Sequence, residues 1–488
     1  MAVIHIPGIR ILSEPVLSKI VDEAIDVLER VGILVENSEA RSLLAEYGQD
    51  VDDTSGTVRF RLETVEWALD SVPKNLSIFD RTGGREMRLQ GDAVHFNPGS
   101  SALRILDRKT NRPRPATAAD VVQFVRLVDA LPGYAAQSTG LIASDVPQSI
   151  ADRFRLYLCL RFGSKPVVTG TFTADGFAAM HKMLCLVRGG EEALRQHPLA
   201  IFDCCPSAPL RWSELGAHDV MACARAGVPA ELVPMALSGA TAPVTLAGTL
   251  VQAAAENLAG LVLHQCAAPG APLIWGGSSA IFDMRYGTTP LGAIETMMLA
   301  LANAEMAKYL GLPSHAYLAL SDAKQLDAQA GFETGVGAVL AVLAGINIIS
   351  GPGMLDFESC QSLEKLLLDH EICTQALRLK RGIESRGEIF AEDLFGNIRE
   401  GDYFLTAEST LRWFREEFVM PGPVLERRNL QEWEAAGAPT LLDRARDEVE
   451  RLLAEHSVQP LEETLAHELE TFMLSEARRA GMEHLPPV

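Results

Sequence analysis

The hydrophobic pattern after about residue 131 repeats one unit, in which a short apolar run precedes a longer helical stretch. A continuous apolar run is typical of a strand buried on both faces, and the helical stretches between the runs favour parallel crossover connections. The seven runs that we interpret as strands are residues 134–140, 165–171, 199–206, 231–239, 272–279, 315–322 and 346–353. An eighth strand is expected from VHFNPG (94–99) or from the chain after residue 388. The pattern therefore predicts an α/β fold, and favours a TIM-type (β/α)8 barrel over an open sheet.

The hydrophobic pattern at the two ends of the chain differs from this repeated unit. Residues 13–31 and 38–47 predict amphipathic helices, and residues 57–115 break into short pieces between Gly, Asn and Pro, which is typical of a small β-rich insertion. The tail after residue 424 contains two charged helical stretches with an apolar face. We expect three parts: N-terminal helices and the β-rich insertion in 1–130, the main body of the barrel in 131–390, and a C-terminal helical extension in 391–488.

Nearly every predicted strand ends in small or polar residues, as in Thr169-Gly170-Thr171 and Ser350-Gly351-Pro352. In a parallel barrel these ends meet at one mouth, where enzymes of this architecture place their chemistry. The polar run SDAKQLDAQAG (321–331) follows one predicted strand. We therefore interpret it as a loop of the mouth, although solvation alone also explains a polar surface turn.

Composition and charge narrow the choice of function. The chain has 43 Lys and Arg against 64 Asp and Glu, a formal net charge of −21 that argues against a nucleic-acid partner. Its eight cysteines show no paired spacings, as expected of reduced thiols. The N-terminus lacks the pattern of a signal peptide, and no window reaches about 18 uninterrupted apolar residues. We therefore expect a cytoplasmic protein without membrane contact.

One long stretch, GATAPVTLAGTLVQAAAENLAGLVLHQCAAPGAPLIWGGSS (239–279), resembles the trimethylamine methyltransferase family of corrinoid-dependent methyltransferases. The resemblance covers about residues 10 to 470 and includes CPSAPLRWSE (205–214), FDMRYGTTPLGAIE (282–295), SDAKQLDAQAGFE (321–333), GPGMLDFES (351–359) and EKLLLDHEI (364–372). It implies a TIM-type barrel that transfers a methyl group from an amine to the Co(I) of a corrinoid on a separate, cognate protein. It also suggests a homo-oligomer.

Family members that use trimethylamine contain pyrrolysine, and this sequence has none. The chain therefore looks like the branch whose members demethylate quaternary amines, with glycine betaine as the best single candidate. Carnitine, proline betaine and γ-butyrobetaine are related substrates. The position that corresponds to pyrrolysine should fall near residues 315–335, but it does not align with one definite residue.

The chemistry of a quaternary amine indicates which residue types to seek. Its demethylation releases a neutral tertiary amine, so the leaving group needs no general acid, and positioning and water exclusion remain. A quaternary ammonium has no N–H donor, so aromatic faces and carboxylates recognise it. The substrate-binding aromatic residues that we predict beside the mouth loops are Phe96, Tyr317, Phe332 and Phe357. His315 and Arg285 are candidates for binding a carboxylate tail.

The acidic residues predicted to act in catalysis are Asp322, Asp327 and Glu358, since the resemblance passes through their loops. Each candidate also has a structural interpretation. Aromatic residues belong in any barrel core, a buried His accepts or donates a structural hydrogen bond, a surface Arg pairs with an acid, and acids favour helix starts.

Other functions remain open from the sequence. The same fold is compatible with another quaternary amine as substrate, with methyl delivery to tetrahydrofolate, or with a non-catalytic scaffold that binds betaine or the corrinoid protein. A zinc-dependent thiol methyltransferase is suggested by the adjacent Cys204 and Cys205. Adjacent strand residues point to opposite faces, however, and no third ligand is placed by spacing, so we expect no directly bound metal.

Overall fold

The computed structural model describes residues 8–386, 395 and 404–488, which form an α/β fold. Within these residues, eight short strands lie at the centre: β6 (His95–Asn97), β9 (Gln137–Ser138), β10 (Val167–Thr169), β11 (Ala200–Cys204), β13 (Ala230–Leu232), β15 (Leu273–Trp275), β17 (His315–Tyr317) and β18 (Ile348–Ser350). Each of the seven apolar runs overlaps one of these strands, and VHFNPG supplies β6. The strand predictions are therefore confirmed.

The central strands pair in parallel within two sheets. One sheet has the order β15-β13-β11-β10-β9, and the other has the order β17-β18-β6. Isolated parallel bridges join Phe96 to Tyr134 and Trp275 to Ser314. Each bridge links an edge of one sheet to an edge of the other, so the two sheets are connected on both sides.

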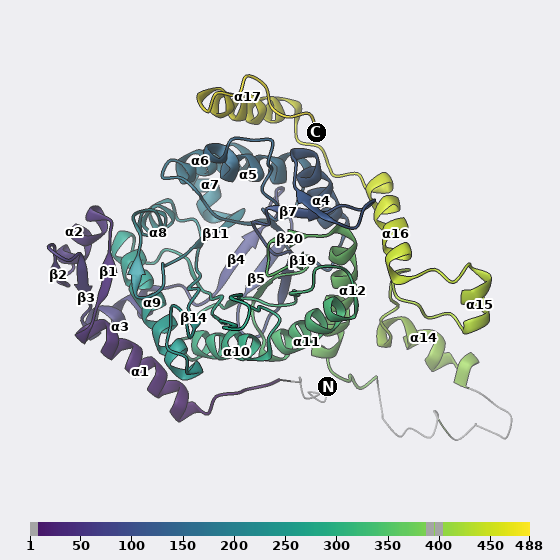
Figure 1. The fold of residues 1–488 in the computed structure, drawn as a ribbon, viewed down its shortest axis with the longest axis horizontal. Coiled ribbons are helices and arrows are strands. Elements are labelled where there is room, and N and C mark those ends of the chain that lie inside the picture. The colour runs from purple at the N-terminus through teal and green to yellow at the C-terminus, as the bar shows by residue number, and fades with distance from the viewer. Residues whose placement is uncertain (1–7, 387–394, 396–403) are drawn as a thin grey trace.

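Helices lie around the outside of these strands (Figure 1). They are α4 (Ala118–Ala130), α5 (Ala151–Phe162), α6 (Gly176–Arg188), α8 (Glu214–Ala226), α9 (Leu246–Ala267), α10 (Ile294–Tyr309), α11 (Ala328–Ala344) and α12 (Leu363–Lys380). A helix follows each strand before the chain returns to the next one, which gives the repeated parallel crossovers that the pattern predicts.

A hairpin of β4 (Leu76–Phe79) and β5 (Glu86–Leu89) fills the amino-terminal end of the strands. Its buried Ile78, Met87 and Leu89 pack with apolar residues from several central strands, which include Val168, Ile201, Ile274 and Ile348. These residues belong to different strands yet share one cluster, so they face the interior enclosed by the strands. The hairpin therefore closes the end of the fold opposite the carboxyl ends of the strands.

The N-terminal helices α1 (Glu14–Arg30) and α2 (Ser38–Glu46) match the two predicted helices. A small sheet with the order β12-β1-β3-β2 lies beside them and contains β12 (Arg211–Trp212), β1 (Ile33–Val35), β3 (Thr57–Arg59) and β2 (Asp50–Asp52). The predicted β-rich stretch is interrupted by α3 (Leu62–Ser71). This helix forms because Val65 and Ala68 are buried on a face that packs against α9.

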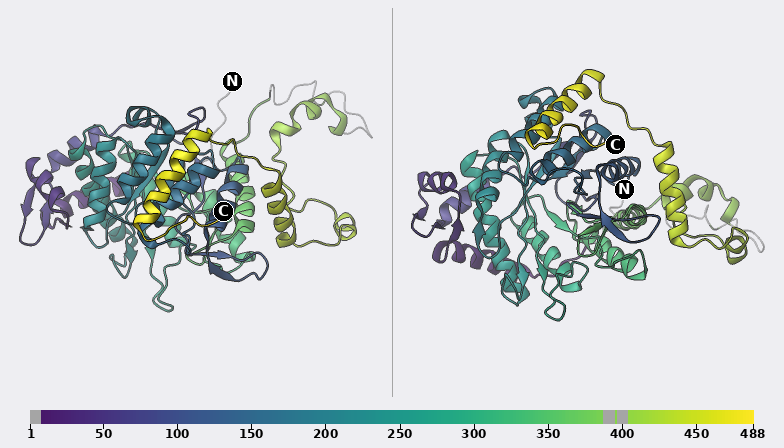
Figure 2. Two further views of the ribbon diagram at one scale, coloured as in Figure 1. Left: turned by 90° about the horizontal axis from the view of Figure 1, so that it is seen from above. Right: turned by 45° about the horizontal axis from the view of Figure 1, so that its top comes forward.

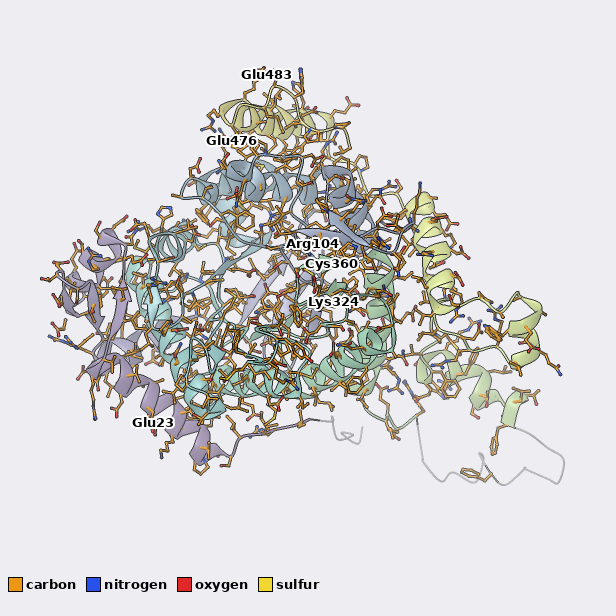
Figure 3. The ribbon with its side chains drawn as sticks, in the orientation of Figure 1. Glu23, Arg104, Lys324, Cys360, Glu476 and Glu483 are labelled. Carbon is orange, nitrogen blue, oxygen red and sulfur yellow. The ribbon has the colours of Figure 1, made fainter. Side chains whose placement is uncertain are left out.

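Both predicted tail helices are present as α16 (Leu441–Glu455) and α17 (Glu463–Arg479), after α14 (Glu408–Glu417) and α15 (Leu430–Ala435). Helix α16 packs on α12 and α4, and α17 packs on α5 and α6 (Figure 2). Glu476 lies on the side of α17 that faces the body of the protein (Figure 3). Its Oε2 accepts a 2.7 Å hydrogen bond from Arg153 Nη1. The tail therefore packs on its own chain.

Helix α9 is long and apolar enough, by length and composition alone, to cross a membrane. However, 78% of its most apolar window is buried inside the structure, among α1, α3, α8 and α10. Its polar side chains have internal partners: Glu256 Oε1 accepts from Leu210 N at 2.9 Å, and Asn257 Nδ2 donates to Gly276 O at 2.9 Å. Helix α9 is therefore a core helix of this fold.

Gly260 of α9 provides a test of this packing. A Cβ at Gly260 would lie 2.3 Å from the buried Trp212 ring, so we expect Gly260→Ala to lower the free energy of unfolding by about 1–3 kcal/mol. The matched control is Gly335→Ala in α11, where a Cβ meets open space, and it should stabilise the helix by about 0.5–1 kcal/mol. Chemical denaturation measures both values. Equal effects of the two substitutions would contradict the buried position of α9.

Candidate functional site

A polar layer lies directly above the apolar interior, towards the carboxyl ends of the strands. Side chains alternate along a strand, so residues two apart share a face. Asp203 follows the inward-facing Ile201 by two positions, and Glu231 pairs in register with both Asp203 and the inward-facing Ile274. On β17, His315 pairs with Ile348 in the same way. The strand register therefore brings acidic and imidazole side chains together in the interior.

His315 belongs to a hydrogen-bond chain that indicates its protonation. Asn97 Nδ2 donates to Pro98 O at 3.0 Å, which orients Asn97 Oδ1 to accept from the Ser350 hydroxyl at 3.0 Å. The Ser350 oxygen must then accept from His315 Nε2, which lies 3.1 Å away. His315 Nδ1 is left without a proton, and it lies 2.8 Å from Glu231 Oε1.

Two lone pairs at this separation would repel each other, so the contact favours a Glu231 carboxyl group that keeps its proton. The two side chains are fully buried, and their contact lacks good hydrogen-bond geometry. Burial raises the pKa of Glu231 to about 8 and lowers the pKa of His315 to about 4. Both directions favour neutral groups, because a low-dielectric surrounding disfavours charge. At neutral pH the pair is therefore a protonated Glu231 beside a neutral His315.

Asp203, Glu231 and Glu358 form what we call the acid cluster. Burial raises the pKa of Asp203 well above its usual range, and the nearby Glu231 charge adds to the shift. The pKa of Glu358 is raised by burial and then by Asp203. Four carboxyl oxygens, Asp203 Oδ1, Glu231 Oε1, Glu231 Oε2 and Glu358 Oε1, are buried without a hydrogen-bond partner among the described residues. Such a cluster attracts a cation, because a positive charge offsets the cost of ionising these carboxyl groups.

Tyr317 connects the acid cluster to the loop after β6. Its hydroxyl donates to Asp203 Oδ2 at 3.2 Å and lies 3.0 Å from Ser100 Oγ. The Tyr317 ring also packs edge-on against the His315 ring, with 4.9 Å between the ring centres. Tyr317 is half-buried. It therefore presents an aromatic surface beside the carboxyl groups.

Glu358 reaches the acid cluster from a strained loop. Asp356, Phe357 and Glu358 have φ values of 53°, 53° and 67°, a left-handed conformation that costs on the order of 1–2 kcal/mol for each residue other than glycine. Lys324 stabilises the loop, because its Nζ lies 2.9 Å from Asp356 Oδ1 and 3.7 Å from the centre of the Phe357 ring. Strain of this kind is typical of loops that position functional groups.

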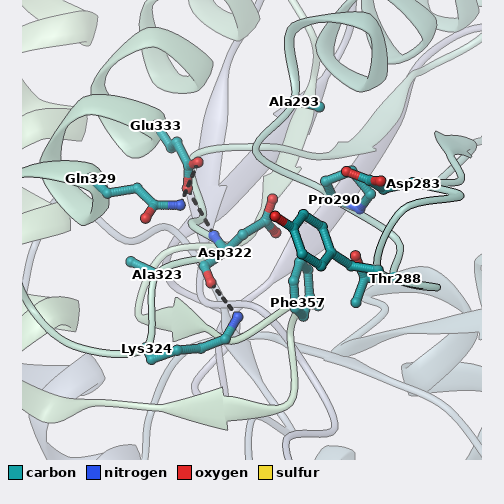
Figure 4. A pocket seen from close by; sticks show the side chains of 11 residues that line it. Asp283, Thr288, Pro290, Ala293, Asp322, Ala323, Lys324, Gln329, Glu333 and Phe357 are labelled. Carbon is teal, nitrogen blue, oxygen red and sulfur yellow. Dashed lines mark hydrogen bonds between the residues drawn. The ribbon is translucent and has the colours of Figure 1, made fainter.

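A pocket of about 350 Å³ opens at the rim of the mouth (Figure 4). We call it the rim pocket, and its lining includes Asp283, Tyr286, Asp322, Lys324, Gln329, Glu333 and Phe357. Asp322 uses both carboxylate oxygens to accept from the backbone of Leu291 and Gly292, at 3.0 and 2.9 Å. Glu333 Oε2 accepts from Ser321 Oγ at 2.6 Å and from Asp322 N at 2.8 Å. These bonds fix the 321–333 loop against the start of α10.

The structure brings some of the predicted residues together. Tyr317, His315 and Glu358 meet at the acid cluster, whereas Asp322 and Phe357 line the rim pocket. Phe96 is 1% exposed and packs in the core cluster. Its role as a contact of the substrate stays a prediction.

Three predicted residues lie outside these two places. Asp327 caps α11, where its side chain accepts from the backbone of Gln329 and Ala330. Phe332 is 68% exposed on the first turns of that helix. The Arg285 side chain is 80% exposed and pairs with Asp283. The positions of Asp327 and Arg285 match their structural interpretations, whereas the exposed Phe332 is not part of a barrel core.

Sequence reasoning missed Asp203, Glu231 and the buried Arg155. Asp203 and Glu231 each stand within an otherwise apolar strand, and this is a signal that the sequence did contain. Arg155 lies on α5 and gives no comparable signal, since arginine is common on helices. All eight cysteines are free, and the described residues contain no group of three or more His, Cys, Asp or Glu arranged to hold a metal ion.

The chain is similar to known proteins along most of its length. The family model for trimethylamine methyltransferase matches residues 2–482. The trimethylamine methyltransferase MttB of Desulfitobacterium hafniense is 31% identical over 466 residues, which are 96% of this chain and 94% of that protein. A glycine betaine methyltransferase of the same species is 28% identical over 480 residues, 98% and 99% of the two chains. The solved monomethylamine methyltransferase of Methanosarcina barkeri has a TM-score of 0.49 and 13% identity, and the match covers 90% of this chain and 94% of that one.

The protonated state of Glu231 predicts a pH-dependent stability. Its pKa is about 8 in the folded protein and close to the ordinary 4.5 when unfolded, so its proton stabilises the fold fully below about 4.5. This stabilisation is lost as the pH rises through 8. Glu231→Gln keeps a donor towards His315 and cannot ionise, so its melting temperature should rise relative to the wild type between pH 5 and pH 9.

Thermal melts across this range measure the difference in melting temperature. The matched control is Glu46→Gln, which removes an exposed carboxyl group at the end of α2 and should not reproduce the trend. A difference between Glu231→Gln and wild type that stays constant from pH 5 to pH 9 would show that Glu231 is ionised throughout.

Proposed function

The chain belongs to the trimethylamine methyltransferase family, and on this premise we propose that it transfers a methyl group from a quaternary amine to the Co(I) of a corrinoid carried by a separate protein. The chain is therefore a methyltransferase. Glycine betaine is the first candidate substrate, because a glycine betaine methyltransferase aligns over 98% of the chain and the sequence contains no pyrrolysine. Carnitine, proline betaine and γ-butyrobetaine are the related candidates.

The acid cluster is the observation that carries this proposal. It gathers three carboxyl groups, each with an unpartnered buried oxygen, beside the half-buried Tyr317 ring. A quaternary ammonium cannot donate hydrogen bonds, so it binds through charge and through contact with an aromatic face. The carboxyl oxygens that receive no hydrogen bond and the adjacent Tyr317 ring meet both needs. A primary or secondary amine would instead favour acceptors arranged along its N–H directions.

The proposed reaction makes limited demands on the protein. When bound, the corrinoid supplies a Co(I) nucleophile for the methyl carbon. The leaving amine is neutral, so no residue needs to donate a proton to it. Tyr317 and the acid cluster hold the ammonium, and the Phe357 loop with Lys324 borders the entrance and helps to exclude water. Orientation of the methyl group then provides the main rate enhancement.

The retained protons of the acid cluster also suit this reaction. The substrate loses its positive charge as the methyl group leaves, so fully ionised carboxylates would stabilise the substrate more than the transition state. The raised pKa values of Asp203 and Glu231 limit the negative charge at neutral pH. The site therefore attracts the cation without holding it too strongly for transfer.

We also propose that the central strands close into one TIM-type (β/α)8 barrel. The two parallel bridges between the sheets and the surrounding helices support this closure. On this basis the described residues of 131–390 form most of the barrel, those of 1–130 add N-terminal elements together with β6, and those of 391–488 form the extension; the boundary at 390/391 lies outside the described residues.

An exposed apolar rim supports docking of a corrinoid protein at the mouth. Its members follow the carboxyl ends of strands or begin a helix there, and they are Leu103, Met235, Val244, Met284, Tyr286 and Phe332, with exposed fractions of 61%, 47%, 69%, 68%, 78% and 68%. Large apolar side chains exposed around a site are typical of a protein-binding surface. The corrinoid would enter over this rim and face the acid cluster below.

The reaction can be tested under anaerobic conditions with reduced cobalamin, alone or on the cognate corrinoid protein. We expect glycine betaine to yield dimethylglycine together with a change in the visible spectrum of the cobalamin. Asp203→Asn should raise the KM for the amine roughly tenfold, because it removes one carboxyl group from the cation site. The control Asp70→Asn changes an exposed carboxyl group on α3 and should leave the KM unchanged. Absence of turnover with every candidate amine and both acceptors would contradict the proposal.

Docking can be tested separately from the methyl transfer itself. Phe332→Ser should raise the KM for the corrinoid protein about fivefold or more, because it removes an exposed aromatic contact of about 1 kcal/mol or more. Its rate with free reduced cobalamin should stay near that of the wild type. The control Phe418→Ser removes a ring of similar exposure, 63%, at the end of the peripheral α14 (Figure 1). If both variants behave alike with the corrinoid protein, the rim is not its docking surface.

A further inference from the structure

Arg155 is a buried cation without a carboxylate partner among the described residues. It lies on α5 and is 1% exposed. Arg153, two positions earlier and equally buried, forms ion pairs with Asp152, Asp175 and Glu476. Arg155 forms none. The two arginines therefore differ in function, because Arg153 ties α17 and a nearby loop to the body whereas the Arg155 charge is left unneutralised.

Neutral acceptors hold the Arg155 guanidinium in place. Its Nη1 donates to Ser101 Oγ and to Thr139 O, each at 2.9 Å, and its Nη2 donates weakly to Gly170 O at 3.4 Å. Nε is buried without a hydrogen-bond partner. The guanidinium carbon lies 4.3 Å from the centre of the Phe172 ring. The group is therefore fixed by these contacts, yet it keeps N–H donors for a further acceptor.

Burying a charge without a counterion is costly, so such groups normally pair or bind a ligand. Burial lowers the pKa of Arg155 to about 10, and the charges of Asp152 and Asp203 act in the opposite direction. Arg155 still carries its charge at neutral pH. A planar guanidinium with free N–H donors is suited to a carboxylate, which it binds with two parallel hydrogen bonds.

Arg155 lies close to the acid cluster. Ser101 accepts from the guanidinium, and the preceding residue, Ser100, lies within 3.0 Å of the Tyr317 hydroxyl that donates to Asp203. The charge of Asp203 also acts on the pKa of Arg155, so the cationic and anionic groups lie within electrostatic reach of each other. Ser101 adopts a left-handed φ of 67°, which is a further sign that this turn is held in a specific shape.

The two ends of the site face accessible space. Ser100, Ser101, Gly170, Phe172 and Asp203 are all half-buried. The strand residues one layer below, such as Val168 and Ile201, are 1% exposed. Exposure therefore begins at the level of Arg155 and Asp203, on the mouth side of the apolar interior.

We infer that Arg155 binds the carboxylate of a zwitterionic substrate, whose quaternary ammonium lies at the acid cluster. This inference rests on the proposed function and narrows it to N-methylated amino acids and related betaines, which carry both charges. It also assigns a carboxylate-binding role that the sequence suggested for His315 and Arg285. His315 is fully buried beside Glu231, and Arg285 is an exposed partner of Asp283.

Calorimetric titration without any corrinoid tests this inference through binding alone. The probes are glycine betaine, proline betaine and γ-butyrobetaine, with choline and tetramethylammonium as cations that lack a carboxylate. At least one betaine should bind the wild type 10-fold or more tightly than choline, since a charged hydrogen-bonded pair contributes a factor of about 10 to 100. Arg155→Gln should remove most of this preference and change choline binding less than about threefold, a loss below 1 kcal/mol.

Two further variants separate binding from structure. Arg155→Lys should keep only part of the preference, because an ammonium cannot form the bidentate contact. Ser101→Gly removes the hydroxyl that orients the guanidinium and suits the left-handed φ, so it tests the site even if Arg155→Gln does not fold. The matched control Arg161→Gln changes a half-buried arginine on the same helix and should not affect either class of probe.

The outcomes are distinguishable. Choline or tetramethylammonium binding as tightly as every betaine would overturn the role of Arg155 and leave the proposed function standing. An equal loss of choline and betaine binding in folded Arg155→Gln would assign the residue to structure. If none of the five probes binds, the quaternary-amine function itself fails, and this inference fails with it.

Discussion

Three neighbouring carboxyl groups, two on parallel strands and one on the 356–358 loop, impose the main constraint on this protein. Such groups are tolerated away from water only if they are neutral, paired or hydrogen-bonded. Asp203 and Glu231 stand in register on neighbouring strands, and the Asn97–Ser350–His315 chain leaves His315 Nδ1 at 2.8 Å from Oε1 of the protonated Glu231 carboxyl group. The β4–β5 hairpin packs at the opposite end, so within the described residues the apolar interior separates this polar layer from that end.

The loops around the mouth are arranged with respect to that layer. Asp322 and Glu333 use their carboxylates to hold backbone amides, so the polar 321–331 loop serves mainly to fix the entrance. The strained 356–358 segment directs Phe357 to the rim pocket and Glu358 to the acid cluster. The protein thus accepts backbone strain where two neighbouring side chains must reach two different places.

The proposed chemistry explains why charge and shape outweigh acid–base groups in this site. A quaternary ammonium leaves as a neutral amine, so the protein needs a cation site of limited negative charge and a surface that admits a corrinoid protein. The acid cluster offers the first, and the exposed apolar rim offers the second. Arg155 adds an opposite charge close by, which would orient a betaine along one direction and present its methyl groups to the mouth.

The sequence by itself determined the α/β class, seven of the strands, the terminal helices and the family, because continuous apolar runs and long motifs are local features, and it left VHFNPG as one of two candidates for the eighth strand. It also pointed to Tyr317, His315 and Glu358, which the structure brings together. It could not tell that the Asp322 and Asp327 carboxylates hold backbone amides whereas Glu358 reaches the acid cluster, because all three are acidic residues in predicted loops. Only the tertiary structure decided that Asp203 faces Glu231 and that, among the described residues, Arg155 lacks a counterion while Arg153 has three. The physical reason is that pairing and desolvation depend on which strands and helices become neighbours, and that is set by contacts between residues far apart in the chain.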